Sequence, residues 1–356
     1  MPVSLPTLGG DNGTWGNKLN SFLRSVVISI EDKGATTTAP DNKTAIQAAI
    51  DDAAAGTSGG VVYIPQGTYN VRSEINMKSG VTLRGAGYNS VIRKGDGSGT
   101  SSIFRDAAGR VSNTTMEYFR IDGNKANNTS QQAPNNTQSG IGYWAAGNND
   151  NLIRNVWIEN CHNTAIGIYG DRNRVINCVV KGIGNSDDPY VIGKSGIVNF
   201  GGVRNIFSGN YIVDVMEHGI KMYNNSNYSI ITNNRFENCR DDGIYVQWNN
   251  YIIIRGNTFR NCADVGIFAQ DCTSTLIVGN TVSDTTHPEW YCTGILTTNG
   301  TQNLIVGNIS NNNKNNGIYI NQSSYSFAIN NVITGNGSSQ ITMTGSQNFE
   351  NNNVKA

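Results

Sequence analysis

Residues 228–250 read YSIITNNRFENCRDDGIYVQWNN, and residues 251–273 read YIIIRGNTFRNCADVGIFAQDCT. Both stretches contain a β-branched run, an Asn step, a second apolar pair, a polar turn and a Gly-Ile pair that opens a third run. Three short strands in every 23 residues or so, with no helix between them, predict a solenoid of parallel β-coils. Equivalent residues of successive coils should then stack about 4.8 Å apart. The sequence therefore predicts an all-β fold.

The stacking predicts ladders of identical residues. Cys161, Cys239 and Cys262 occupy the same position of their repeats, and an Asn precedes each of them. Because Cys behaves as a small buried hydrophobe, we expect a stack of free thiols inside the solenoid, with disulfides between coils as the alternative. We expect the asparagines Asn160, Asn238 and Asn261 to form a ladder in the turns.

The composition limits the partners of the chain. Its formal net charge is zero and only 15% of its 356 residues are charged, which argues against nucleic acid or an anionic membrane surface. We find no apolar run of about 18 residues, so no membrane span is expected. The N-terminal stretch MPVSLPTLGGDNG has no basic segment followed by an apolar one, so no ordinary signal peptide is predicted.

The segment before the coils carries a family resemblance. Residues 30–71 read IEDKGATTTAPDNKTAIQAAIDDAAAGTSGGVVYIPQGTYNV, and residues 81–92 read VTLRGAGYNSVI. The helical spacing in DNKTAIQAAIDDAAA predicts an α-helix that covers the open end of the solenoid. Together these stretches resemble the start of the pectate-lyase/polygalacturonase-like superfamily. The resemblance implies a right-handed parallel β-helix with an N-terminal capping α-helix.

A second, shorter resemblance concerns the attachment of the protein. Residues 5–23, LPTLGGDNGTWGNKLNSFL, are similar to a segment at the start of phage tail-fibre and tailspike proteins. This similarity implies an extracellular or virion-associated depolymerase with a polysaccharide substrate, a phage tail as partner and a homotrimer as a further expectation. The predicted division is an attachment segment at 1–29, a cap at 30–80 and a β-helix with the carbohydrate-binding groove at 81–356.

An acidic column marks the candidate site. Glu217, Asp241 and Asp264 each stand two residues before the glycine of their repeat, and Lys194 holds that position on the coil before. Stacked like charges destabilise a sheet, and such conflicts tend to mark functional sites. Repulsion should raise the pKa of one carboxyl and leave its neighbour ionised, which is the pairing that glycoside cleavage needs.

The site residues follow from this column and its surroundings. Residues that alternate outward beside the column, and loops inserted on both sides of it, should bind the sugar chain. The residues predicted to act in catalysis are Asp241, Asp242, Glu217, His218 and Asp264. The residues predicted to bind substrate are Lys194, Lys221, Tyr223, Tyr245, Gln247 and Trp290. No metal ligand is predicted.

The polygalacturonase pattern fits only in part. Asp241 and Asp242 before Gly-Ile match that family's Asp-Asp pair, and the match implies an acid and a base of an inverting hydrolysis. The neighbouring coils depart from the pattern, because they read Met216-Glu217-His218 and Asp264-Val265-Gly266. The looser Asp and Glu clusters of tailspike hydrolases are more similar, so the stereochemical outcome stays open.

Three functions remain open at this stage. The leading hypothesis is an endo-acting glycoside hydrolase without a cofactor. The second is a polysaccharide lyase or C5-epimerase acting on uronate polymers, with His218, Lys221 or Tyr245 as the base. The uronate carboxylate would be neutralised by Lys194, by Arg240 or, for a lyase, by a Ca²⁺ held by the acidic column. The third is a non-catalytic, glycan-binding receptor fibre of a phage.

Overall fold

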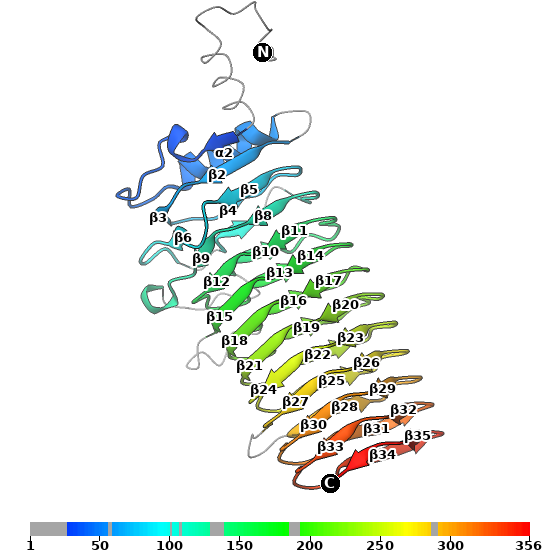
Figure 1. The fold of residues 1–356 in the computed structure, drawn as a ribbon. Coiled ribbons are helices and arrows are strands. Elements are labelled where there is room, and N and C mark those ends of the chain that lie inside the picture. Colours follow the sequence, from blue (N-terminus) through cyan, green and yellow to red (C-terminus); the bar gives the residue numbers. More distant parts are fainter. Residues whose placement is uncertain are drawn as a thin grey trace, which may run out of the picture.

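The computed structural model describes residues 27–55, 59–99, 102–106, 109–128, 139–184, 193–285 and 291–356. These residues form an elongated stack of coils, with the N-terminal helix at one end and the C-terminus at the other (Figure 1). Every strand pairing within the described residues is parallel, and each coil contributes one strand to each of three sheets. The predicted all-β solenoid with three strands per repeat is confirmed.

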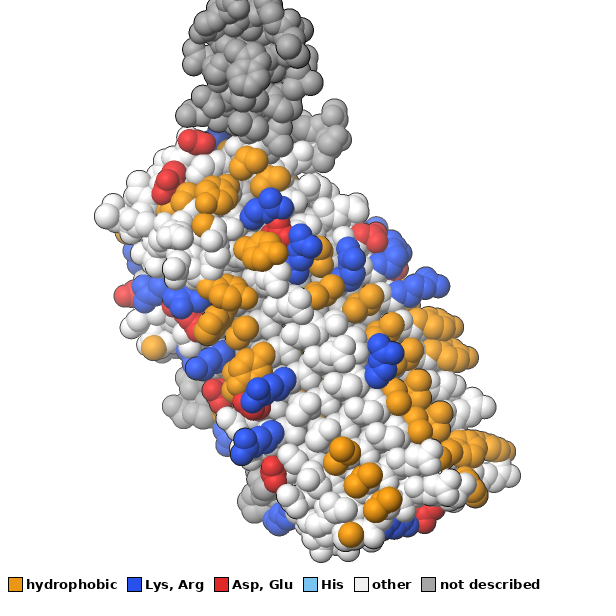
Figure 2. All heavy atoms as spheres, in the orientation of Figure 1, with side chains coloured by type: hydrophobic (Ala, Val, Ile, Leu, Met, Phe, Trp, Pro, Cys, Tyr) orange, Lys and Arg blue, Asp and Glu red, His pale blue; other side chains and the backbone are white. Residues whose placement is uncertain are grey.

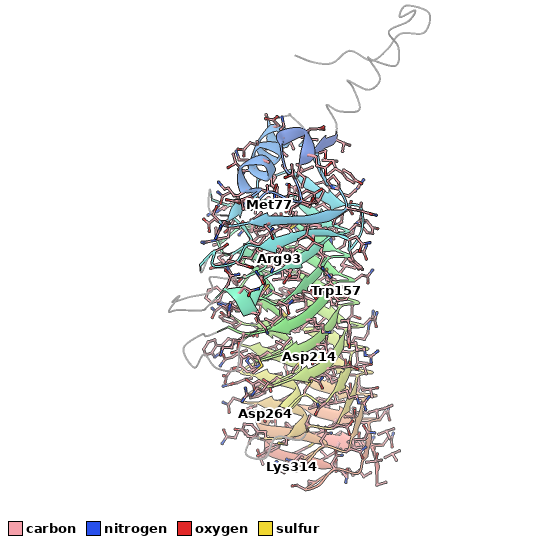
Figure 3. The ribbon with its side chains drawn as sticks, turned by 90° about the vertical axis from the view of Figure 1, so that its left-hand side faces the viewer. Met77, Arg93, Trp157, Asp214, Asp264 and Lys314 are labelled. Carbon is pink, nitrogen blue, oxygen red and sulfur yellow. The ribbon has the colours of Figure 1, made fainter. Side chains whose placement is uncertain are left out.

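The three sheets, named here sheet A, sheet B and sheet C, run the length of the stack. In the described residues sheet A contains β1 (Val27–Ser29), β2 (Val61–Ile64), β5 (Thr82–Gly85), β8 (Thr115–Glu117), β11 (Leu152–Arg154), β14 (Arg174–Ile176), β17 (Ile206–Ser208), β20 (Ile230–Thr232), β23 (Ile253–Arg255), β26 (Leu276–Val278), β29 (Leu304–Val306), β32 (Phe327–Ile329) and β35 (Phe349–Asn351). Sheet B contains β3 (Gly67–Val71), β6 (Ser90–Lys94), β9 (Arg120–Asp122), β12 (Trp157–Glu159), β15 (Val179–Ile183), β18 (Tyr211–Val215), β21 (Arg235–Cys239), β24 (Thr258–Arg260), β27 (Thr281–Ser283), β30 (Ile309–Asn311), β33 (Val332–Thr334) and β36 (Val354–Lys355). Sheet C contains β4 (Ile75–Asn76), β7 (Phe104–Arg105), β10 (Ile141–Tyr143), β13 (Ile166–Ile168), β16 (Ile197–Asn199), β19 (Ile220–Met222), β22 (Ile244–Gln247), β25 (Val265–Gln270), β28 (Thr293–Thr298), β31 (Ile318–Ser324) and β34 (Ile341–Ser346). Figure 3 views the coils from the side of sheet B, where Arg93, Trp157 and Asp214 mark three of its strands.

The helices lie at the N-terminal end and in one turn. The α-helix α2 (Lys43–Ala54) buries Ile46, Ala49, Ile50 and Ala53, and its apolar face joins the core at the end of the stack. Two short 3₁₀ turns, η1 (Glu31–Lys33) and η2 (Lys125–Asn127), complete the helical segments of the described chain. The predicted capping helix is therefore confirmed, and no helix in these segments is long and apolar enough to cross a membrane.

The predicted boundaries are only partly visible. Strands β2, β3 and β4 precede residue 81 and pair in the same three sheets as the later coils, so the sheets cross the predicted boundary between cap and β-helix. Of the predicted attachment segment, residues 27–29 form β1 and the remainder lies outside the described residues. The division into domains stays a prediction.

Apolar ladders fill the interior, as alternation along each strand requires. Phe236 and Phe259 occupy the same inward position of adjacent coils, and their rings stack 4.7 Å apart at 3°. Cys161, Cys239 and Cys262 are buried free thiols, as expected. The predicted turn ladder is confirmed in part, because the side-chain amide of Asn261 donates to Oδ1 of Asn238 at 2.8 Å. Asn160 does not join it, since its amide donates to Oδ1 of Asp122 on the coil before.

A second asparagine ladder, fully buried, lies in the turn between sheet A and sheet B. In each coil the side-chain amide donates to Oδ1 of the equivalent residue on the next coil, and that Oδ1 also accepts the backbone N–H. Its members are Asn210, Asn234, Asn257, Asn280, Asn308 and Asn331. The ladder satisfies backbone groups that the turn removes from the sheets, so it holds the corner of every coil together.

Candidate functional site

The acidic column forms where the turn from sheet B enters sheet C. Asp241 donates its backbone N–H to the carbonyl of Glu217 at 3.3 Å, and Asp264 donates to the carbonyl of Asp241 at 3.2 Å. The three carboxyl residues therefore sit on successive coils directly before β19, β22 and β25. The structure brings together the column that the repeat spacing indicated.

The carboxyl groups of this cluster differ in exposure. The side chains of Glu217 and Asp241 are 23% and 29% exposed, whereas that of Asp242 is 3% exposed. Asp242 points inward and accepts the backbone N–H of Val265 through Oδ1 at 3.1 Å. Asp264 is buried and accepts the N–H of Cys292. Of the four acidic residues, only Glu217 and Asp241 are thus placed to touch a polymer.

His218 lies beneath this surface and connects the carboxyl groups. Its Nε2 is 3.7 Å from Glu217, and its Nδ1 is 3.6 Å from Asp241 and 3.1 Å from Asp242. The imidazole stacks on the ring of Tyr245, with centroids 4.9 Å apart, and its side chain is only 8% exposed. Because both ring nitrogens face carboxyl groups, the geometry fits a positioning residue better than a base that meets the sugar.

Lys221 supplies the positive charge on the open face. It pairs in register with Tyr245, which confirms that alternation directs both side chains outward. Its Nζ donates to Oε1 of Glu217 at 3.1 Å and lies 5.9 and 5.8 Å from the ring centroids of Tyr223 and Tyr245. Ser195 donates to the other oxygen of Glu217 at 2.8 Å, so that carboxylate is held on both sides.

The surroundings of Asp241 and Glu217, the two partly exposed carboxyls, shift their pKa values in opposite directions. Burial, and then the charge of Asp242, raise the pKa of Asp241 to about 7. Burial alone would raise the pKa of Glu217, but His218, Lys221 and Ser195 outweigh it and hold that pKa below its ordinary value. Burial also lowers the pKa of His218, while the charges of Asp241 and Glu217 raise it. One carboxyl is therefore a proton donor while its neighbour is ionised.

Asp242 gives the first testable prediction. Its burial raises its pKa well above the ordinary 3.8, so folding is penalised progressively as pH rises above 3.8. We expect Asp242→Asn to raise the free energy of unfolding at pH 8 by about 1–2 kcal/mol, because the amide keeps the bond from Val265 and removes a buried charge. At pH 4 the gain should vanish. Denaturant unfolding at both pH values measures it, and an equal gain at both would contradict the explanation.

Of the remaining predicted residues, Tyr245, Gln247 and Lys194 lie in the described part of the chain and Trp290 does not. Tyr245 donates its hydroxyl to Oε1 of Gln270, and Gln247 pairs in register with the same residue, so both lie on the outer side of sheet C. Lys194 is half-buried on the coil before the column. Trp290, and most of both inserted loops, lie outside the described residues. The binding roles of all these side chains stay predictions.

Sequence reasoning missed part of the aromatic surface. Phe268 pairs in register with Tyr245 and meets its ring edge-on at 5.3 Å, and Tyr291 lies 6.3 Å beyond. On the other side of the column, Phe200 lies 4.5 Å from the ring of Tyr223. The sequence carries a signal for these rings, since outward positions of sheet C repeat with the coil period and Phe268 stands one repeat after Tyr245.

A metal ion has one candidate set of ligands in the described residues. One atom each from His218, Asp241 and Asp242 lies within 4.8 Å of the others. An imidazole nitrogen with two carboxylates suits a transition-metal ion better than Ca²⁺, which prefers oxygen ligands throughout. The Ca²⁺ expected under the lyase hypothesis therefore finds no all-oxygen set in this triad, and the expectation that a hydrolase needs no cofactor stays a prediction.

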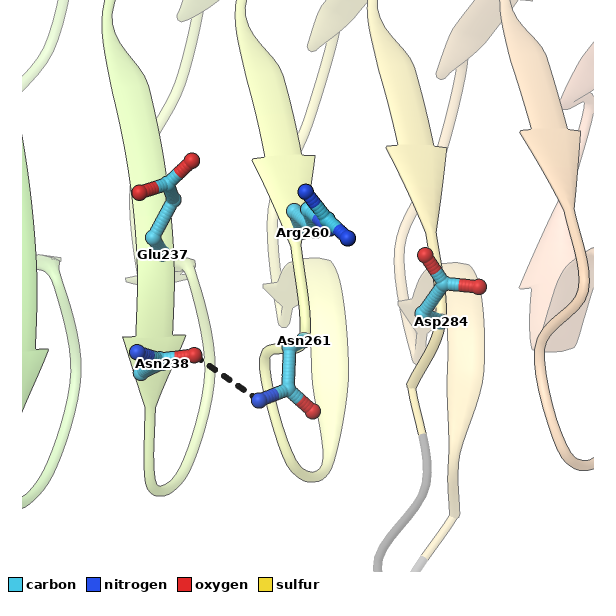
Figure 4. A pocket seen from close by; sticks show the side chains of 5 residues that line it. All are labelled: Glu237, Asn238, Arg260, Asn261 and Asp284. Atoms are coloured by element: carbon cyan, nitrogen blue, oxygen red, sulfur yellow. Dashed lines mark hydrogen bonds between the residues drawn. The ribbon is translucent and has the colours of Figure 1, made fainter.

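A separate polar pocket lies earlier in the same turns, on the side of sheet B. It has a volume of about 410 Å³ and is lined by Glu237, Asn238, Arg260, Asn261 and Asp284. Figure 4 shows the ladder bond between Asn261 and Asn238 crossing its floor, with the charged side chains on neighbouring strands. None of its residues belongs to the acidic column, so the two features are distinct.

Comparisons with known proteins support the fold. A family model described as a right-handed β-helix region matches residues 195–354. Mannuronan C5-epimerase AlgE3 of Azotobacter vinelandii is 30% identical over 232 residues, which is 60% of this chain. The match spans 12% of AlgE3, so the chain covers only a small part of that relative.

Two solved structures extend the comparison over nearly the whole chain. The A-module of mannuronan C-5 epimerase AlgE6 from A. vinelandii superposes with a TM-score of 0.68 at 20% identity, over 92% of this chain and 99% of that one. The Dettilon tailspike protein superposes with a TM-score of 0.61 at 14% identity, over 96% of this chain and 64% of that one. At such identities the likeness concerns the fold, and the predicted right-handed parallel β-helix is confirmed.

Proposed function

We propose that this right-handed parallel β-helix protein is an endo-acting glycoside hydrolase that cleaves a polysaccharide over the outer face of sheet C. The observation that carries the proposal is the pair of exposed carboxyls on adjacent coils, Asp241 with its pKa raised to about 7 and Glu217 with its pKa lowered. Opposite pKa shifts in neighbouring carboxyls are what an acid–base pair for glycoside cleavage requires.

The roles follow from protonation. Asp241 carries a proton at and below pH 7 and would donate it to the leaving glycosidic oxygen. Glu217 is ionised and would either activate a water molecule or attack the anomeric carbon. Lys221 and Ser195 orient Glu217, while the rings of Tyr223 and Tyr245 flank the ammonium group of Lys221 on the open face. Burial and the charge of Asp242 raise the pKa of Asp241, and His218 lowers it.

The pH dependence of the rate is the second prediction. Because Asp241 must be protonated, kcat/KM should fall about tenfold for each pH unit above 7. His218, Asp242, Asp264 and Glu217 all contribute to the pKa of Asp241, so the midpoint belongs to the cluster as a whole. Initial rates between pH 5 and 9, on enzyme shown to stay folded, measure it. A rate that rises through pH 7 would remove Asp241 from the role of acid.

A second candidate function is C5-epimerisation of a uronate polymer. The similarity to AlgE3, a mannuronan C5-epimerase, favours it. Lys221 would neutralise the uronate carboxylate, and Glu217 beside it would take the proton from the adjacent carbon. A protonated group on the other side of the sugar, for which the Tyr245 hydroxyl is the candidate, would return a proton to the opposite face of that carbon. Tyr245 is a weaker candidate for the base, because burial raises its pKa and its hydroxyl already donates to Gln270.

One incubation distinguishes these reactions. The protein is incubated with a panel of neutral and uronate polysaccharides while reducing ends and ultraviolet absorbance are followed together, and the products are examined by proton NMR. New reducing ends without absorbance support the hydrolase. Reducing ends with absorbance indicate a lyase, and a changed sugar configuration with an unchanged chain length indicates an epimerase. Binding without any product would indicate a receptor fibre.

The setting of the enzyme is part of the proposal. The likeness to a tailspike protein supports an extracellular or virion-associated location and a polysaccharide partner. Attachment to a phage tail rests on residues 5–23, which lie outside the described residues, and a homotrimer rests on the resemblance alone.

A further inference from the structure

The outer face of sheet A changes character along the stack. From β17 to β35 the first outward position of every strand is a large apolar side chain, in the order Ile206, Ile230, Ile253, Leu276, Leu304, Phe327 and Phe349. From β26 to β32 the second outward position is apolar too, at Val278, Val306 and Ile329. We name these ten residues the sheet A ladder.

The same sheet provides an internal control. In the preceding coils four outward positions hold the charged residues Arg84, Glu117, Arg154 and Arg174, and the others hold Thr82, Thr115, Leu152 and Ile176. Glu117 accepts hydrogen bonds from Arg84 and Arg154. The outer face of the sheet is therefore mixed up to β14, and its first outward position becomes apolar in every strand from β17 on. Figure 2 shows the change on its right-hand side, with charged side chains over the upper coils and hydrophobic ones over the lower coils.

Part of sheet B provides a second control. The outward positions of β21, β24 and β27 in sheet B are Arg235 and Glu237, Thr258 and Arg260, and Thr281 and Ser283. Further along, sheet B also presents apolar side chains, because Ile309, Val332 and Val354 on β30, β33 and β36 are exposed. Between β21 and β27 the outward face of sheet B is therefore polar while that of sheet A is apolar, and nearer the C-terminus both sheets present apolar side chains.

Exposed aromatic residues extend this face at its edge. Tyr228, Tyr251 and Tyr325 project from the turn between sheet C and sheet A and are 50–52% exposed, and the first two rings stack 4.9 Å apart. Phe327 and Phe349 are 38% and 51% exposed. A contiguous apolar patch rimmed by tyrosines is typical of a protein interface, and parallel sheets are usually covered on both faces.

We propose that the sheet A ladder is a self-association surface on which a second copy of this chain docks through its own ladder. The sheet A ladder spans six steps of about 4.8 Å between coils. With a width of about 20 Å, which includes the tyrosines, its area is roughly 600 Å² per copy. Two copies would bury roughly 1,200 Å², which reaches the lower limit of about 1,200 Å² for stable interfaces.

The chemistry favours a second copy over a glycan or an unrelated protein. The ladder offers branched aliphatic side chains and few of the polar groups that would orient a sugar. An identical ladder has the same spacing, so its ridges can enter the grooves of the first along the whole contact. Docking on sheet A leaves the acidic column on sheet C uncovered, so association does not depend on the proposed enzymatic function.

The mass of the protein in solution tests the proposal. Size-exclusion chromatography with light scattering on the full chain, at 1 to 100 µM, should give twice the chain mass of 38.4 kDa at the upper concentrations. The variant Leu276→Lys/Leu304→Lys should lose the dimer and elute as a monomer. The matched control Thr258→Lys/Thr281→Lys places the same charges on sheet B of the neighbouring coils and should remain a dimer.

A second measurement needs no variant. Hydroxyl-radical footprinting of the unaltered protein should show protection of Tyr251, Phe327 and Phe349 that increases with concentration, while Tyr245 on sheet C stays unchanged. A monomer at every concentration, a trimer as the resemblance implies, or a dimer that the Leu276→Lys/Leu304→Lys variant retains in a folded state, would overturn the proposal. Neither measurement involves turnover, so failure of the proposed hydrolase would leave it untouched.

Discussion

Replacing Asp241 by Asn should reduce kcat on the cleaved polysaccharide by at least 10³-fold, which is within the usual range of about 10²- to 10⁴-fold for a lost general acid. The amide cannot donate an acidic proton to the leaving oxygen, yet it matches the carboxyl in size. KM should change little, because Lys221 and the rings of Tyr223 and Tyr245 remain in place. Steady-state kinetics on a defined oligosaccharide, with reducing ends as the signal, measure both quantities.

The control for this variant is Asp214→Asn. Asp214 is an exposed carboxyl on β18 of sheet B, and it accepts a hydrogen bond from Asn238 that an amide oxygen can still accept. We expect unchanged kinetics from it. If Asp241→Asn cleaves as fast as the unaltered protein, Asp241 is not the acid. If the unaltered protein changes the configuration of a uronate polymer and Asp241→Asn keeps that activity, the epimerase with Glu217 as base becomes the better assignment.

Replacing Asn257 by Ala should lower the free energy of unfolding by about 3 kcal/mol, the largest stability effect that we expect from a single polar residue. Its Oδ1 accepts the backbone N–H and the side-chain amide of Asn234, and its own amide donates to the carbonyl of Ile231 and to Asn280. All of these side chains are buried, so the substitution removes the acceptor of two Asn234 donors and the donor to the Ile231 carbonyl where water does not reach.

Thr258→Ala is the matched control, because Thr258 is the next residue and points outward from sheet B. Urea unfolding followed by circular dichroism should show a midpoint close to that of the unaltered protein for Thr258→Ala and a clearly lower one for Asn257→Ala. Equal midpoints for the two variants would mean that the turns do not depend on the asparagine ladder.

The repeat made the fold predictable. In the quoted pair of coils, apolar residues alternate with a period of two inside strands, and the whole pattern recurs after about 23 residues. Both periods are local properties, because alternation decides which side chains face the core, and the recurrence decides which ones stack. That information sufficed for the parallel sheets, the free thiols and the position of the acidic column, and the helical spacing of residues 41–55 sufficed for the capping helix.

Only the tertiary structure decides which residues of the site are exposed and which are buried. Asp241 and Asp242 are adjacent in the chain, yet one is partly exposed and the other is buried, because turn residues have no periodicity that fixes their direction. His218 lies against Asp242 of the next coil, and its imidazole is buried by that contact between coils. The pKa values that separate Asp241 from Glu217 arise from the same contacts between coils.

The sheet A ladder illustrates the same limit in a different way. Each of its residues is an ordinary β-branched, leucine or phenylalanine position in its own strand, and a strand pattern alone does not distinguish an apolar face covered by the core from one exposed to solvent. The sequence by itself determined the coil, its register and the column of charge. Only the stacking of coils decided which carboxyls are exposed, which are buried and which apolar face remains uncovered, because burial depends on contacts between residues 23 or more positions apart.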